Sequence, residues 1–486
     1  MTRIQTIIPG LILLLPTVSS SQSLRPTVGS GDFSVGFRIE RTYDAGRTHL
    51  RGDRYGSRPL QIAIWYPAHS SDSTSMTLGD YTALTASAET PDEATQAQKR
   101  AAFLRYRPYL STDDAFDRVF SQAMGAVRDA EVLSGSFPVV VYGPSQGGSA
   151  FDNAVLCEFL ASHGYIVASV ASKGPYSRKM PMNSAGVEAQ VRDLEYLAGF
   201  LHGYPNADTS RMNAVGFSLG GLSNLVFAMR YVDVDAVVSF DGTIGSSIGY
   251  EILQSYPYLD ADALRSPFLV FAGNKFRVNQ FKFFEDNRFA DAHVVKMKGR
   301  NHLQFSSFNL MFSTQSQPVL DSYRAMCEYT IAFLNHHGAD TDELFAGFSS
   351  DSSSPIFGTY LEKRATPAPP SEEEFYAIIT NLGVDKGVAT YYSVKASFPE
   401  YTMMEYRSFR DVGWGMLIER RLEEAIKLFE VLVDAYPDNP DSYRRLGEAH
   451  MENGSSEEAL VHLRKSLALD SESSGVIQMI NRLERE

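Results

Sequence analysis

The chain has 486 residues, of which 44% are hydrophobic and 21% are charged, as in an ordinary globular protein. This length exceeds that of a usual single domain, so we expect two domains that each bury a core. The net charge of −14 comes without a basic stripe or an alternation of basic and aromatic residues, which excludes the phosphate neutralisation that nucleic-acid binding requires.

The N-terminal residues 1–23 have the pattern of a secretory signal peptide. Arg3 precedes an apolar run from Ile7 to Leu15, and small polar residues follow this run. Neither this run nor any later segment is long enough to span a bilayer as a helix, so we expect an exported protein, periplasmic or secreted, without a transmembrane span. The alternative is that the apolar run forms a buried N-terminal strand.

The chain contains two cysteines, Cys157 and Cys327. Each lies within an apolar helical pattern, which favours two thiols buried in a core. A single disulfide is the alternative, because an exported protein leaves the reducing cytosol.

Residues 33–338 are predicted to form an α/β domain that opens with two antiparallel strands, near 35–39 and 60–66. Residues 68–135 carry no strong strand signal and predict helices over 97–106 and 115–130, so we interpret them as an insertion that could serve as a lid. After Pro138, strands and helices alternate, which predicts a mostly parallel sheet with helices on both faces. The predicted strands are 139–142, 165–170, 212–217, 236–240, 268–272 and 293–297, and the predicted helices are 150–162, 187–201, 219–231 and 318–335.

Residues 339–371 lose this periodicity and are rich in Ser, Pro and acidic residues, which predicts a linker. Residues 372–486 repeat themselves. The matched pairs, each separated by 34 positions, are Gly413 and Gly447, Ala425 and Ala459, and Phe429 and Leu463. This is the tetratricopeptide period, so we predict an all-α helical-repeat module. Helices near 372–382 and 475–483 are expected to cap the stack.

The string G-x-S-x-G, which marks a nucleophilic serine on a sharp turn, occurs three times, centred on Ser145, Ser218 and Ser247. Because so short a string also occurs by chance, its context must decide. A nucleophile elbow requires an apolar strand that ends at the first glycine and a helix that begins just after the serine. Ser218 meets both requirements, since it follows the strand 212–217 and precedes the helix 219–231. We therefore predict that Ser218 is the nucleophile.

Ser145 is the main alternative, because it also follows a strand. It ends the first strand after the insertion, however, where this type of fold carries its oxyanion loop, and Pro144 would constrain an elbow. Ser247 has no strand directly before it and lies in a Gly–Ser context typical of a loop. The remaining alternative is that neither strand-ending serine is catalytic.

The acid and the histidine of such a site follow the nucleophile in chain order, each on a loop after a later strand. Asp241 ends the strand 236–240, and the position after the strand 268–272 offers no carboxylate, which favours Asp241 as the acid. Of ten histidines, His302 is the one that lies in the loop after the last parallel strand. The alternatives are an aspartate that only starts a turn and a loop histidine without a partner.

Several of these segments match one family. They are Leu60 to Pro67, which ends in Trp-Tyr-Pro, Pro138 to Gly148, Gly216 to Gly221, Asp241, and His302 followed by Phe305 and Phe308. On these residues the chain resembles, from Val35 to Phe312, the platelet-activating-factor acetylhydrolase and dienelactone-hydrolase-like group of α/β-hydrolases. The resemblance implies the α/β-hydrolase fold, a Ser-Asp-His triad and the hydrolysis of esters with short or oxidised acyl chains. One departure is Pro144-Ser145 where relatives carry His-Gly, which leaves the substrate open.

These residues imply a reaction through an acyl-enzyme, with no metal or cofactor. Ser218 would attack the ester carbonyl while His302 takes its proton and Asp241 orients the imidazole. The backbone N–H groups of Leu219 and Gln146 are predicted to bind the oxyanion. The sequence contains no metal-binding spacing, phosphate loop or dinucleotide fingerprint.

Apolar residues after His302 either line an acyl pocket or belong to a core helix, which is the favoured interpretation. They are Phe305, Phe308, Leu310, Met311 and Phe312. The expected substrate is a small-molecule or lipid ester, and the repeats could bind a partner protein or another copy of the chain. The competing hypothesis is a catalytically silent hydrolase fold that acts as a scaffold for protein interactions through its repeats.

Overall fold

A computed structural model describes residues 27–51, 53–90, 92–110, 112–231, 233–256, 259–274, 282–312, 315–336, 342–345 and 354–485. The predicted signal peptide, residues 1–23, lies outside the described residues. The chain divides into two compact units, Met1–Thr366 and Pro367–Glu486, and each unit has its own hydrophobic clusters. None of the described helices combines the length and the apolar character that crossing a membrane requires.

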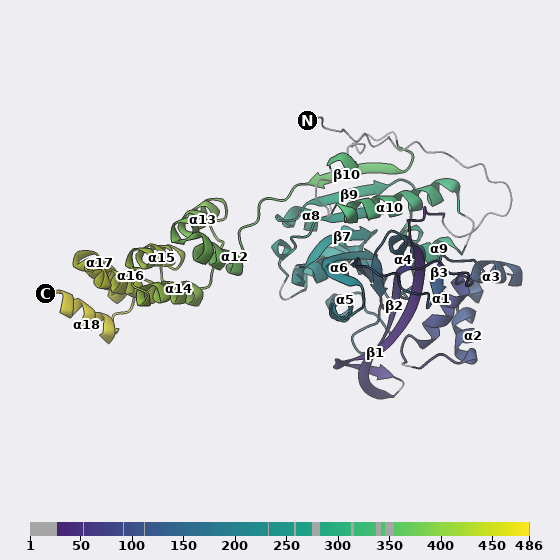
Figure 1. The fold of residues 1–486 in the computed structure, drawn as a ribbon, viewed down its shortest axis with the longest axis horizontal. Helices are drawn as coiled ribbons and strands as arrows, with labels where there is room; N and C mark the ends of the chain where they lie inside the picture. The colour runs from purple at the N-terminus through teal and green to yellow at the C-terminus, as the bar shows by residue number, and fades with distance from the viewer. Residues whose placement is uncertain are drawn as a thin grey trace. The chain divides into compact units, whose positions relative to one another are not determined.

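The first unit is built on a ten-stranded sheet with the order β10-β9-β8-β7-β6-β4-β5-β2-β1-β3 (Figure 1). Its strands are β1 (Ser34–Arg51), β2 (Arg54–Ala68), β3 (Ala126–Arg128), β4 (Phe137–Gly143), β5 (Ile166–Ser169), β6 (Ala207–Phe217), β7 (Val234–Phe240), β8 (Phe268–Ala272), β9 (Ala292–Met297) and β10 (Phe357–Lys363). The six strands from β5 to β9 in this order are parallel to one another. The hairpin of β1 and β2 joins them antiparallel at one end, and β10 does so at the other.

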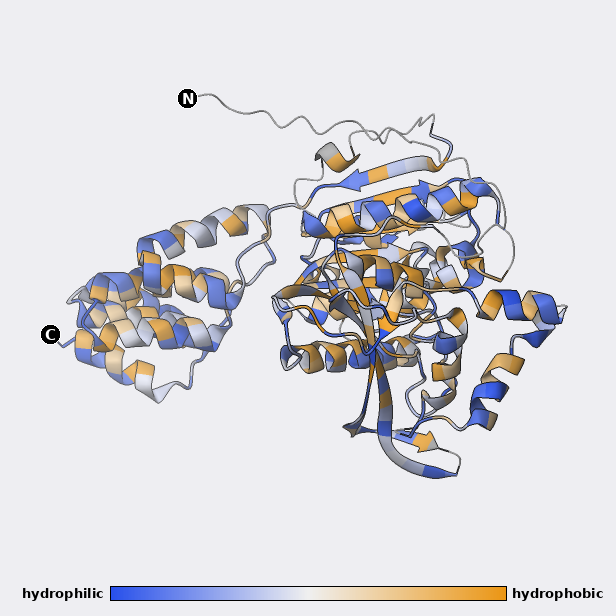
Figure 2. Ribbon diagram, turned by 45° about the vertical axis from the view of Figure 1, so that its right-hand side comes forward, coloured by the Kyte–Doolittle hydropathy of each residue, from blue (hydrophilic) through white to orange (hydrophobic). Residues whose placement is uncertain are grey.

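Helices cover both faces of this sheet. They are α4 (Ala154–Ser162) and α10 (Gln317–Asn335) on one face, and α5 (Ser184–His202) and α6 (Leu219–Arg230) on the other. Successive strand residues point to opposite layers, so Val140 packs on the side of α4 and Val141 on the side of α5. Figure 2 shows the hydrophobic strands enclosed between the helices. The unit has the mostly parallel sheet with helices on both faces that the alternating sequence pattern predicts, and this architecture is that of the α/β-hydrolase fold, which the family resemblance implies.

The two cysteines lie in the layer that covers one face of the sheet, Cys157 on α4 and Cys327 on α10. Both are buried and neither is in a disulfide, as predicted for core thiols. Burial raises the pKa of both thiols, so they stay protonated at neutral pH.

The segment between β2 and β4 forms the predicted insertion, with helices α1 (Leu78–Leu84), α2 (Gln96–Leu104) and α3 (Asp113–Phe120). The helix predicted over 115–130 is wrong beyond Phe120, because the chain then forms β3 and pairs with β1. The buried carboxylate of Glu158 accepts hydrogen bonds from the N–H groups of Gly125 and Ala126, at 2.8 and 3.1 Å. A tertiary contact thus replaces the helical hydrogen bonds at this point.

The structure also corrects the predicted linker over residues 339–371. Helix α11 (Asp342–Phe345) and strand β10 lie within this segment, and β10 completes one edge of the sheet beside β9. The hydroxyl of Tyr360 on β10 lies 2.8 Å from Nδ1 of His293 on β9, and its ring stacks on Phe345 with centroids 5.2 Å apart. Without β10, the edge of β9 would expose unpaired backbone groups.

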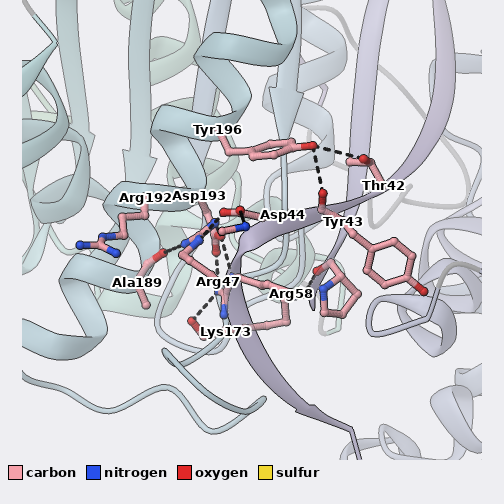
Figure 3. A network of polar contacts seen from close by, with 12 residues as sticks. Thr42, Tyr43, Asp44, Arg47, Arg58, Lys173, Ala189, Arg192, Asp193 and Tyr196 are labelled. Atoms are coloured by element: carbon pink, nitrogen blue, oxygen red, sulfur yellow. Dashed lines mark hydrogen bonds and ion pairs between the residues drawn. The ribbon is translucent and has the colours of Figure 1, made fainter. Parts of the chain in front are cut away.

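Buried ion pairs tie the long β1–β2 hairpin to α5 (Figure 3). Asp193 on α5 accepts hydrogen bonds from Arg58 at 2.8 and 2.5 Å and from Arg47 at 2.7 Å. Arg58 also donates to the carbonyls of Gly174 and Lys173, at 2.7 and 3.1 Å. Burial acts to raise the pKa of Asp193, but the two guanidinium groups hold it below its usual value. The carboxylate is therefore ionised and holds the hairpin in place.

The second unit consists of antiparallel helices. They are α12 (Glu372–Ala377), α13 (Val384–Ser397), α14 (Tyr406–Ile418), α15 (Leu422–Ala435), α16 (Pro440–Glu452), α17 (Ser456–Leu469) and α18 (Ser474–Leu483). The repeated glycines mark the close contacts within each helix pair: a Cβ on Gly413 would lie 2.5 Å from the ring of Phe429, and one on Gly447 would lie 2.7 Å from Leu463. In both repeats, the glycine on the first helix thus lets the large apolar side chain of the second helix pack against its backbone.

Candidate active site

Ser218 lies on a sharp turn between β6 and α6. Its backbone has φ 58° and ψ −119°, a conformation that residues with a side chain rarely adopt. Small neighbours allow the turn, because a Cβ on Gly216 would collide with Gly220, and a Cβ on Gly220 would collide with the carbonyl group of Gly143. The turn has the geometry of a nucleophile elbow and presents the serine hydroxyl at the carboxyl end of the parallel strands.

The three residues predicted to form a triad meet at this end of the sheet. Nε2 of His302, in the loop after β9, lies 2.9 Å from Oγ of Ser218. Nδ1 of His302 lies 2.7 Å from Oδ2 of Asp241, which directly follows β7. The other carboxylate oxygen of Asp241 accepts the N–H of Gly273 at 2.7 Å, so both oxygens are engaged.

The side chain of Arg300, which is fully buried, binds the loop that carries His302. Its guanidinium donates to the carbonyls of Gln304 and Val319 and lies over the ring of Phe305, 4.9 Å from the centroid. Burial lowers the pKa of Arg300 to about 10, so the group remains charged at neutral pH. The sequence pattern assigns no role to Arg300. The one feature that could have drawn attention to it is its position, two residues before the predicted catalytic histidine.

The other two G-x-S-x-G serines lie elsewhere. Ser145 follows β4, as expected, and its backbone N–H donates to Asp152. Ser247 is the first residue of a short helix, α7 (Ser247–Gln254), rather than part of a loop, because Ser246 caps this helix by accepting the N–H of Gly249 at 3.2 Å. Among the described histidines, none forms a hydrogen bond with Ser145 or Ser247.

Two backbone segments flank the hydroxyl of Ser218. One is the start of α6, where the N–H of Leu219 has no acceptor within the helix because it belongs to the first turn. The other is the loop of residues 144–148 after β4, which we call the β4 loop. Since Gly143 pairs with Gly216 in the parallel ladder, this loop runs alongside the turn that carries Ser218.

The donors of the β4 loop can be counted. Pro144 has no N–H, Ser145 donates its N–H to Asp152 at 2.9 Å, and Gly148 donates its N–H to the carbonyl of Ser145 at 2.8 Å. The described residues supply no acceptor for the backbone N–H of Gln146. The same holds for the N–H of Gly147, which has φ 64°, so the loop leaves two adjacent N–H groups free, and the first of them is the donor at Gln146 that the sequence predicts.

A hollow of about 540 Å³ lies next to the histidine loop. It is lined by Tyr106, Asn301, Leu303, Gln304, Phe308, Asn309, Phe312 and Gln315. Tyr106 comes from the insertion, and its ring contacts those of Phe308 and Phe312, with centroids 5.2 and 5.4 Å apart. The aromatic residues after His302 therefore divide: Phe305 belongs to the core, together with Leu310 and Met311, whereas Phe308 and Phe312 are half-buried and line the hollow.

A serine, a histidine and a carboxylate in this order can move a proton from the hydroxyl to the imidazole and stabilise the imidazolium that results. The described residues contain no group of three or more His, Cys, Asp or Glu side chains that could hold a metal ion. The chemistry that the arrangement supports directly is nucleophilic attack by Ser218.

Comparison with known proteins agrees with the repeat module. A family model for the tetratricopeptide repeat matches residues 416–478, which confirms the prediction from the 34-residue spacing. No curated protein matches the chain. Among solved structures, the chain is similar to a ferulic acid esterase from Streptomyces cinnamoneus, with a TM-score of 0.48 and 18% sequence identity over 65% of this chain and 93% of that chain.

Proposed function

We propose that the chain is a serine hydrolase that cleaves carboxylic esters. The observation that carries this proposal is the hydrogen-bonded series from Ser218 through His302 to Asp241, at 2.9 and 2.7 Å. The side chain of His302 is 39% exposed, so a substrate can reach the relay from solvent. A strained serine at a helix start, engaged by a histidine that a carboxylate orients, is an arrangement suited to acyl transfer.

The reaction proceeds in two halves. Oγ of Ser218 attacks the ester carbonyl carbon while Nε2 of His302 takes the hydroxyl proton, and the alcohol then leaves with that proton, which produces the acyl-enzyme. Water attacks the acyl-enzyme in the same way and releases the carboxylic acid. The N–H groups of Leu219 and Gln146 are proposed to bind the oxyanion in both halves.

The proposed substrate is a small-molecule or lipid ester with a short or oxidised acyl chain. The family resemblance suggests this class, and the hollow of about 540 Å³ beside the histidine loop offers aromatic walls for such a chain. Export from the cytosol fits an enzyme of this kind, and the repeats are proposed to bind a partner protein or a second copy of the chain.

Labelling with a fluorophosphonate probe tests the proposed nucleophile. We expect the parent and the Ser145→Ala and Ser247→Ala variants to take the label and Ser218→Ala to lose it, together with at least about 10⁴-fold of the turnover of p-nitrophenyl esters. Esters of rising acyl length then define the preferred chain. An unlabelled parent would favour the silent scaffold, and loss of label in Ser145→Ala alone would make Ser145 the nucleophile.

A further inference from the structure

Asp152, just before α4, holds one side of the β4 loop. Its side chain is buried, with Oδ2 accepting the N–H of Ser145 and Oδ1 accepting the hydroxyl of Tyr142, both at 2.9 Å. The first of these bonds fixes the Pro144–Ser145 peptide unit, which is joined through Cα of Ser145 to the unit that carries the Gln146 N–H. The orientation of the Gln146 N–H therefore depends on a carboxylate that no motif in the sequence marks.

Gln190, on α5, holds the same loop from the other side. Its side-chain amide is buried and donates to the carbonyl of Pro144 at 2.8 Å, while its carbonyl oxygen accepts the hydroxyl of Ser223 at 2.9 Å. Ser223 belongs to α6, the helix that begins immediately after Ser218. Gln190 thus links the β4 loop to the helix of the nucleophile.

The backbone of Asp152 and the side chain of Asn153 also bind the segment that follows His302, residues 305–308. The backbone carbonyl of Asp152 accepts the N–H of Phe308 at 3.1 Å, and the side chain of Asn153 donates to the carbonyl of Phe305 at 2.9 Å and accepts the N–H of Ser307 at 2.7 Å. One short stretch of chain therefore connects the β4 loop with the segment that follows His302.

We propose that Asp152 and Gln190 are positioning residues that set the Gln146 N–H against the oxyanion formed at Ser218. This inference rests on the proposed ester hydrolysis. A donor stabilises an oxyanion strongly only if it is already in place before the charge develops. Because Pro144 has no N–H and the N–H of Ser145 is bound to Asp152, the donors that remain free before Gly148 are the N–H groups of Gln146 and Gly147. Gln146 is the one next to the peptide unit that Asp152 and Gln190 hold.

The ionised form of Asp152 costs free energy in the folded chain. Burial raises the pKa of Asp152 to about 6, although the hydrogen bonds from Ser145 and Tyr142 act to lower it. Its ionised form therefore weakens the fold at neutral pH. The carboxylate is nevertheless held by hydrogen bonds from Ser145 and Tyr142, and through the first of them it fixes the geometry of the β4 loop.

The test compares Asp152→Ala, Asp152→Asn and Gln190→Ala with the parent. Turnover of a p-nitrophenyl ester is measured per active site titrated with fluorophosphonate, and hydrogen–deuterium exchange is followed over residues 144–148. We expect Asp152→Ala to lower kcat about tenfold to a hundredfold with KM changed less than about threefold, and to speed exchange in the loop. Asp152→Asn should restore most of kcat, because its amide oxygen can still accept the N–H of Ser145. Gln190→Ala should lower kcat independently, so it tests the inference even if Asp152→Ala does not fold.

Glu158 provides the matched control. It lies on α4, is buried like Asp152, and accepts two backbone N–H groups and the hydroxyl of Tyr81, but it holds the insertion and not the β4 loop. Glu158→Ala should keep kcat per titrated site within about twofold of the parent even if its Tm falls.

Parent kcat and slow loop exchange in both Asp152→Ala and Gln190→Ala would overturn the inference. An equal loss of kcat in Glu158→Ala would also overturn the inference, because it would show that the loss of kcat in Asp152→Ala follows from general destabilisation of the fold. A parent that hydrolyses no ester and takes no label would instead overturn the proposed function, and the positioning role with it.

Discussion

Asp241 illustrates how much a single orientation matters in this site. One carboxylate oxygen faces Nδ1 of His302 at 2.7 Å and the other is fixed by the N–H of Gly273, also at 2.7 Å. The positive φ of Asp241, 43°, turns its side chain toward the histidine directly after β7 ends. The imidazole is thus held with its other nitrogen toward Ser218.

The corresponding prediction concerns Asp241→Asn. The amide would present an N–H to Nδ1 of His302 and favour the wrong tautomer, so we expect kcat to fall about 10³- to 10⁴-fold without a large change in Tm. The matched control is Asp233→Asn, an exposed aspartate just before the opposite end of β7, which should leave kcat unchanged. If Asp241→Asn kept more than about a tenth of the parent kcat, the acid would have to be another group.

At the scale of elements, β10 decides where the first unit ends. The strand pairs with β9 over Phe357 to Lys363, and Tyr360 packs on His293 and Phe345. A boundary at residue 338, as the sequence predicts, would remove this strand and expose the edge of β9. The structure instead places the end of the first unit after Thr366, so that β10 belongs to this unit.

Two truncated chains check this boundary. The chain that ends after residue 366 should unfold cooperatively and keep its ester hydrolysis, whereas the chain that ends after residue 338 should lose at least about 5 °C in Tm and aggregate more readily. Thermal unfolding followed by circular dichroism and light scattering makes the comparison. Equal Tm values for the two chains would show that β10 adds nothing to the stability of the sheet.

On the scale of the whole molecule, the two units have separate cores and should respond differently to pH. In the repeat unit, the rings of His450 on α16 and His462 on α17 stack with centroids 5.4 Å apart. Burial and the neighbouring His450 lower the pKa of His462 from its ordinary value of 6.5. Between the folded and unfolded pKa values, the unfolded chain binds the proton more readily, so the stability of the repeat unit falls as the pH drops below about 6.5.

Calorimetry of the full chain between about pH 7.5 and pH 5.5 measures this effect. The transition of the repeat unit, identified by its absence from the chain that ends after residue 366, should move to lower temperature as the pH falls. His462→Gln should remove most of this dependence. A transition that moves equally in His462→Gln would assign the effect to other groups.

The amino-acid sequence by itself determines the parallel strands, the helices on both faces, the repeat spacing and the order Ser218, Asp241, His302. These features are local, since apolar periodicity, a strand–turn–helix junction and a fixed repeat can each be recognised within a short stretch of chain. The elbow glycines carry the same local information, because the turn at Ser218 cannot form without them.

Only the tertiary structure decides where α3 ends, where the first unit stops, and what holds the β4 loop. Beyond the end of α3, Glu158 accepts the N–H groups of Gly125 and Ala126 from a distant helix. β10 gains its stability from β9, and Asp152 and Gln190 act on the β4 loop from separate elements. Each of these depends on a contact between residues far apart in the sequence. These hydrogen bonds and this strand pairing stabilise the chain only when the groups that make them are buried and correctly oriented, which requires that the sheet has already formed.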